Sequence, residues 1–107
     1  MRALVLAGAM MASGLASVPA GAKPVAHTAT VIIDKLAFGA VPTNLRVGDS
    51  VLWVNHDLFR HSATANGHFD MDLPAGAQRR MLLTKPGAFP FTCKYHPGMK
   101  GVLKVSR

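Results

Sequence analysis

The stretch "FTCKYHPGMKG", residues 91–101, holds the only cysteine of the chain on a short turn between two strand-like segments. Cys93, His96 and Met99 follow one another at intervals of three residues. A thiolate, an imidazole and a thioether together favour copper over magnesium or calcium, and zinc rarely takes methionine. The stretch therefore predicts a β-hairpin whose loop binds a soft metal ion through these three side chains.

A fourth ligand is expected from the histidines upstream of this turn. "VLWVN", residues 51–55, is typical of a strand buried between two layers, and His61 follows it at the start of "HSATA", which can begin the next strand. His61 is therefore the predicted ligand and His68 the alternative, while His56 falls in a predicted turn. Two histidines, a cysteine and a weak axial methionine form the trigonal site of blue-copper electron-transfer proteins.

The rest of the chain predicts an all-β domain. Strand-like segments run over residues 27–38, 51–55, 79–84, 88–93 and 101–106, and glycine and proline punctuate the segments between them. Residues 57–76 are expected to be irregular apart from "HSATA". No segment after the N-terminal leader shows a helical stripe, so we expect a β-sandwich or a barrel.

The N-terminal segment is typical of an export signal. Arg2 precedes an apolar run of small residues, and residues 20–22, Ala-Gly-Ala, have the small-x-small form of a signal-peptidase site. We expect residues 1–22 to be a signal peptide and residues 23–107 to be the single mature domain. The alternative is an uncleaved anchor, for which the run is short. In an oxidising compartment a lone cysteine forms no internal disulfide, which favours a metal as its partner.

The chain is basic, with 12 Lys and Arg against 5 Asp and Glu and a formal charge of +7. These cations are scattered and are not interleaved with stacking aromatic residues, so we expect no nucleic-acid binding. Arg60, Lys94 and Lys100 each lie beside a proposed ligand. They form either a basic rim that steers an acidic redox partner or an ordinary solvated surface.

The chain resembles the cupredoxins, most closely the group of amicyanin, pseudoazurin and plastocyanin. The resemblance extends over "FGAVPTNLRVGDSVLWVNHD", "RHSATA", "GHFDMDLPAG" and "KPGAFPFTCKYHPGMKG". It implies a Greek-key β-sandwich with one type 1 copper ion, in which His61 and His96 are nitrogen ligands, Cys93 the thiolate and Met99 the axial sulfur. Many members have asparagine after the first ligand histidine, where this chain has Ser62, so we expect a shorter side chain to replace part of the hydrogen bonding around the site.

The resemblance also implies a function. We expect a periplasmic one-electron carrier that cycles copper between Cu(I) and Cu(II) and is not an enzyme. We further expect a monomer that meets redox partner proteins and has no membrane contact after signal cleavage. A copper chaperone or copper-storage protein with the same ligands is the alternative, and a structural zinc module is a third. Copper oxidases and nitrite reductases with this fold need further ligands, and the remaining histidines form no second H-x-H cluster.

Overall fold

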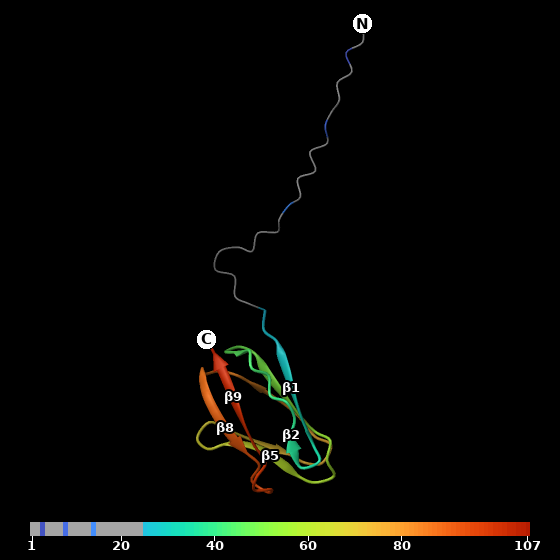
Figure 1. The fold of residues 1–107 in the computed structure, drawn as a ribbon, viewed down its shortest axis with the longest axis vertical. Helices are drawn as coiled ribbons and strands as arrows, with labels where there is room; N and C mark the ends of the chain where they lie inside the picture. The colour runs from blue at the N-terminus through green and yellow to red at the C-terminus, as the bar shows by residue number, and fades with distance from the viewer. Residues whose placement is uncertain (1–2, 4–7, 9–13, 15–24) are drawn as a thin grey trace.

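The computed structural model describes residues 3, 8, 14 and 25–107. The predicted signal peptide and its cleavage site after Ala22 lie outside the described residues, three single positions excepted. Over the described range the chain forms nine strands and no helix (Figure 1), which confirms the all-β prediction. No helix long and apolar enough to span a bilayer occurs in that range.

The strands form two sheets that pack face to face as a Greek-key sandwich. They are β1 (Thr28–Asp34), β2 (Ala37–Phe38), β3 (Leu45–Arg46), β4 (Ser50–Asn55), β5 (His61–Ala65), β6 (Phe69–Leu73), β7 (Gln78–Leu82), β8 (Gly87–Thr92) and β9 (Lys100–Ser106). The first sheet has the order β2-β1-β4-β7 and the second the order β3-β9-β8-β5-β6. β1 and β4 pair in parallel, as do β3 and β9, and the other pairs are antiparallel.

The register of the second sheet places the turn that holds Cys93, His96 and Met99 beside the start of β5. β5 and β8 are antiparallel neighbours, with Thr64 opposite Thr92. β5 begins at His61 and β8 ends at Thr92, so the antiparallel pairing brings His61 and Cys93 to the same end of the sheet. β8 and β9 form the predicted hairpin, and residues 93–99 are its loop.

The space between the sheets is filled by aromatic and branched side chains. β9 alternates buried and exposed residues along most of its length, as a strand with one face on the core does. Trp53 is fully buried. Its ring lies 5.2 Å from that of Phe91, 6.1 Å from that of Phe38 and 6.2 Å from that of Phe69, measured between centroids. The expected role of Trp53 in the core is thus confirmed.

Two predicted segments were wrong. Residues 57–76 contain a second strand, β6, which pairs with β5 along its whole length. Asp70 and Asp72 point outward from β6 and make its sequence look like a loop. The predicted strand over residues 27–38 is two strands, because the chain turns at Lys35 and Leu36 with left-handed φ angles of 52° and 60°. Leucine seldom takes this conformation, so its sequence carries no turn signal.

Candidate metal centre

Three of the predicted ligands meet at the end of the second sheet. Cys93 Sγ lies 3.7 Å from His61 Nδ1 and 3.8 Å from His96 Nδ1. The three donor atoms all lie within 4.8 Å of one another. Cys93 and His61 are buried and His96 is half-buried, so the group is open to solvent only on the side of His96.

These separations fit a metal ion in a trigonal arrangement. Metal–sulfur and metal–nitrogen bonds of about 2.3 and 2.0–2.1 Å, set at 120°, hold sulfur and nitrogen about 3.8 Å apart. The observed distances of 3.7 and 3.8 Å agree with this value. The three donor atoms therefore lie close enough together to hold one metal ion.

Met99 lies on the same loop and is buried, with 5% of its surface exposed. Two backbone hydrogen bonds close the loop: Cys93 N–H donates to the carbonyl of Met99 at 3.1 Å, and Met99 N–H donates to the carbonyl of His96 at 3.2 Å. Gly98 has a φ of 102°, which the tight loop requires and which glycine adopts without strain. The short loop thus keeps Cys93, His96 and Met99 within one compact turn.

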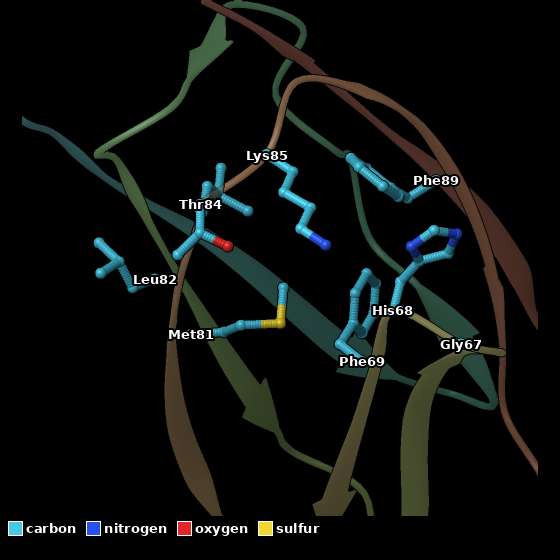
Figure 2. Close-up of a pocket in the computed structure, with 9 residues that line it drawn as sticks. Gly67, His68, Phe69, Met81, Leu82, Thr84, Lys85 and Phe89 are labelled. Carbon is cyan, nitrogen blue, oxygen red and sulfur yellow. The ribbon is translucent and has the colours of Figure 1, made fainter.

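The alternative histidines lie elsewhere. His68 lines a cavity of about 260 Å³ among β6, β7 and β8, together with Met81 and Phe89 (Figure 2). Its ring packs edge-on against Phe89 at 4.9 Å. His56 is exposed. Among the described residues, one group of three His, Cys, Asp or Glu side chains is close enough together to hold a metal ion. This group does not contain His56 or His68.

Asp57 orients the His61 ring. His61 is fully buried, and its Nε2 donates a hydrogen bond to Asp57 Oδ2 at 2.7 Å. Because Nε2 carries the proton, Nδ1 is the free nitrogen that faces Cys93. The same carboxylate accepts the N–H groups of Leu36 at 2.9 Å and Lys35 at 2.8 Å. Donation by Leu36, followed by His61 and Lys35, holds the pKa of Asp57 below its usual range.

Ser62 joins β5 to the cysteine loop by two hydrogen bonds. Its backbone N–H donates to Cys93 Sγ at 3.4 Å, and its hydroxyl oxygen accepts the backbone N–H of Lys94 at 2.9 Å. Ser62 itself is fully buried, and its bond to Cys93 Sγ is shielded from water. The loop is therefore held to β5 without an asparagine at this position.

The surroundings of Cys93 favour the deprotonated form of its thiol. Burial by itself raises the pKa of a thiol. Here hydrogen bonds from His96 and from the backbone N–H groups of Ser62 and Tyr95 outweigh burial and lower the pKa of Cys93 to about 6. The thiolate is the form that binds metal ions, and it predominates at neutral pH in this environment.

Asn55 shapes the loop that leads from β4 to His61. Its side-chain nitrogen donates to the carbonyls of Phe59 at 2.8 Å and Leu73 at 2.9 Å, and its oxygen accepts the backbone N–H of Asp57 at 2.9 Å. The ring of Phe59 in turn lies 6.2 Å from that of His96, edge-on. One buried amide thus fixes the backbone of two residues that touch the proposed ligands.

Two of the three rim cations are paired with acidic side chains. Arg60 lies 3.7 Å from Asp72, and Lys94 lies 3.0 Å from Asp70. Lys100 is exposed and has no ion pair within the described part of the chain. The net positive charge around the site is therefore smaller than the sequence indicates.

Four residues that support the site were not predicted from the sequence: Asn55, Asp57, Thr64 and Asp70. A signal existed for the first two, because "NHD" directly after a buried strand is typical of a turn in which asparagine caps the N–H two residues on. No signal existed for Thr64 and Asp70, because their role depends on the β5–β6 pairing.

Comparisons with known proteins agree with this fold. No family model matches the chain. Amicyanin-alpha of Methylorubrum extorquens is 30% identical over an alignment 122 positions long, which covers 98% of this chain and 99% of the relative. An oxidized alanine-for-proline mutant of amicyanin superposes with a TM-score of 0.64 at 23% identity, over 74% of this chain and 82% of that chain. A copper-containing nitrite reductase of Thermus scotoductus SA-01 gives a TM-score of 0.63 at 31% identity, over 84% of this chain and 25% of that chain.

Proposed function

Because the chain belongs to the cupredoxins, the small blue-copper proteins, we propose that it carries single electrons on one type 1 copper ion held by His61, Cys93, His96 and Met99. The observation that carries this proposal is the meeting of Cys93 Sγ with two imidazole Nδ1 atoms at 3.7 and 3.8 Å. Thiolate, imidazole and thioether donors suit both oxidation states of copper, and no other class of site uses this combination as regularly.

Copper supplies the one-electron chemistry, and the protein keeps its ligands in place. Asp57 fixes the His61 ring, and Ser62 and the backbone bonds of residues 93–99 fix the cysteine loop. With both ligand segments held this way, a change of oxidation state requires little movement of the chain. Small movement means a small reorganisation cost, which favours fast electron transfer.

We propose that electrons leave through His96, the half-buried ligand. Its neighbours include exposed apolar groups: Phe59, whose ring lies 6.2 Å from that of His96, is 57% exposed, and Tyr95, the preceding residue, is 46% exposed. Weak electron-transfer encounters bury small interfaces, so a patch of this size is sufficient. The proposed partners are redox proteins that meet this apolar patch.

The ion pairs of Arg60 and Lys94 argue against strong steering by charge. Lys100 alone attracts an acidic partner only weakly, because exposed charges are screened over about 8–10 Å at physiological ionic strength. We therefore expect the bimolecular electron-transfer rate to change less than about threefold between low and physiological salt. A tenfold fall with added salt would instead support an acidic partner and a basic rim.

We also propose that residues 1–22 are removed on export and that residues 23–107 act in the periplasm as a monomer. The support is the small-x-small site at residues 20–22 and the apolar run before it. Sequencing the N terminus of protein purified from a periplasmic fraction tests this proposal. Lys23 as the first residue agrees with it, and Met1 as the first residue contradicts it.

The experiment that tests the function is voltammetry of the copper-loaded chain. A reversible one-electron wave with fast self-exchange is expected of a carrier. Rapid loss of Cu(I) to an acceptor protein would indicate the alternative, a copper chaperone or store.

Cys93→Ser is the matched control, because it removes the thiolate and leaves the fold. A blue band that persists in this variant would contradict the ligand assignment. Copper-dependent turnover of nitrite by the isolated chain would overturn the view that it is not an enzyme.

A further inference from the structure

A closed ring of hydrogen bonds joins the cysteine loop to the surface strand β6. The backbone N–H of Lys94 donates to Ser62 Oγ at 2.9 Å, and Ser62 Oγ lies 2.9 Å from Thr64 Oγ1. Thr64 Oγ1 donates to Asp70 Oδ1 at 2.9 Å, and Lys94 Nζ donates to Asp70 Oδ2 at 3.0 Å. The ring thus begins and ends on Lys94, the residue that follows the proposed thiolate ligand.

The direction of every bond in the ring is fixed by proton counting. Asp70 is ionised at neutral pH, because Lys94 and Thr64 lower its pKa, and a carboxylate only accepts. The single hydroxyl proton of Thr64 therefore goes to Asp70. Thr64 Oγ1 must accept in its contact with Ser62, so the Ser62 proton points to Thr64. Ser62 Oγ is then left with its lone pairs toward the Lys94 N–H.

We propose that Thr64, Asp70 and the Lys94 side chain are positioning residues, which lock the Ser62 hydroxyl so that it holds the Cys93 loop on β5. A serine hydroxyl alone rotates among three staggered positions and does not select one acceptor. The chain of donors that ends on a carboxylate selects one, and each bond polarises the next. The ring thereby gives a short side chain the fixed orientation that an asparagine amide at this position would have by its shape.

The ring also connects the surface ion pair between Lys94 and Asp70 to a buried residue. Side chains of Lys94 and Asp70 are 44% and 56% exposed, and such a pair by itself contributes little stability. Here it is connected through Thr64 to Ser62, which is fully buried. A change at the surface is therefore transmitted to the backbone next to Cys93. Asp72, which is exposed on β6 like Asp70, pairs with Arg60, and among the described residues no side-chain hydrogen bond joins it to Thr64 or Ser62.

The test measures amide hydrogen exchange at Lys94 in the metal-free protein, so it does not depend on the proposed copper function. Thr64→Val and Asp70→Ala are each expected to speed exchange of the Lys94 N–H at least about tenfold, relative to the N–H of the buried residue Leu103 in the same sample. Thr64→Ser, which keeps a hydroxyl, restores the slow rate. Asp72→Ala is the matched control, because it removes the same charge from the same strand, and it leaves the Lys94 rate unchanged.

A double-mutant cycle separates the ring from a general loss of stability. Ser62→Ala removes the hydroxyl that Thr64 locks, so adding Thr64→Val to Ser62→Ala is expected to change the Lys94 rate no further. The proposal is overturned if Thr64→Val and Asp70→Ala leave the ratio of Lys94 to Leu103 exchange unchanged. It is equally overturned if Asp72→Ala has the same effect as Asp70→Ala, or if the two changes in the cycle are additive.

A second readout rests on the proposed function. In the copper-loaded protein, Thr64→Val and Asp70→Ala are expected to shift the reduction potential in the same direction, and Asp72→Ala to leave it in place. Faster Lys94 exchange with an unchanged reduction potential would mean that the ring orders the cysteine loop only in the metal-free protein. That result would contradict an effect of the ring on the Cys93 ligand. A protein that binds no copper, yet shows the exchange pattern, would contradict the function and leave the ring intact.

Discussion

Replacing Asn55 with alanine is expected to loosen the loop that carries His61. The side chain is fully buried and makes three short hydrogen bonds: to the carbonyls of Phe59 and Leu73 and from the N–H of Asp57. The bond to Leu73 is buried, so its loss leaves a carbonyl without a partner at a cost of about 1–3 kcal/mol. The other two bonds are partly accessible to water and contribute about 0.5–1.5 kcal/mol each.

These terms predict that Asn55→Ala lowers the free energy of unfolding by about 2–6 kcal/mol. A domain of this size has a total stability of about 4–12 kcal/mol, so the loss is a large fraction of it. Urea unfolding of the metal-free protein measures the change, and the fluorescence of Trp53, the one tryptophan of the chain, reports on the core. We expect the midpoint to fall by about 1 M urea or more.

Two further variants make this prediction specific. Asn66→Ala removes an exposed asparagine from the turn between β5 and β6 and is expected to change stability by less than about 0.5 kcal/mol. Asn55→Asp keeps the acceptor for the Asp57 N–H but turns a carboxylate oxygen toward two carbonyls, so it destabilises at least as much as alanine. If Asn55→Ala were as stable as Asn66→Ala, the hydrogen bonds of Asn55 would not organise the loop.

Three other predictions concern the ligands and the core. Met99→Leu is expected to keep the blue colour and to raise the reduction potential, because an apolar axial group disfavours Cu(II). Each tenfold loss of Cu(II) affinity relative to Cu(I) raises the potential by about 59 mV in voltammetry. An equal or lower potential would exclude Met99 as the axial ligand. In the metal-free protein, ultraviolet absorbance of the thiolate should rise with pH with a midpoint at about 6, and a midpoint near 9.0, the pKa of an unperturbed cysteine, would contradict the proposed hydrogen bonds to Cys93. Since this pKa lies below the unfolded value of 9.0, the thiolate stabilises the metal-free fold above pH 9, and that contribution is lost as the pH falls to about 6. Gly101→Ala would place a methyl group 2.5 Å from the buried ring of Phe91 and should cost about 1–3 kcal/mol in urea unfolding, whereas Val102→Ala on the exposed face should cost far less.

Much of the fold and the proposed ligand set could be predicted from the sequence, because they depend on local patterns. The turn with Cys93, His96 and Met99 is local, and its flanking strands alternate in a way that the sequence displays. His61 could be chosen over His68 because the buried segment "VLWVN" precedes it. The structure brings His61, Cys93 and His96 together and leaves His68 apart, as predicted.

The supporting residues depend on pairing that the sequence does not display. Asp57 reaches His61 only because the loop over residues 56–60 folds back under Asn55. Its other contacts are with a turn at Lys35 and Leu36 that has no turn residues. Likewise, Asp70 contacts Lys94 because β6 pairs with β5. β6 was not predicted as a strand, because its exposed carboxylates are typical of a loop. Long-range register, rather than composition, decides these contacts.

The central claim is that His61, Cys93, His96 and Met99 form a type 1 copper site. The most direct test adds one equivalent of Cu(II) to the wild-type chain, to His61→Ala and to His68→Ala, and records visible absorption and electron paramagnetic resonance spectra. We predict an intense blue band with narrow copper hyperfine splitting in the wild type and in His68→Ala, and its loss or change of type in His61→Ala. A pale wild-type spectrum with wide hyperfine splitting, or a blue band that survives His61→Ala and disappears in His68→Ala, would contradict the claim.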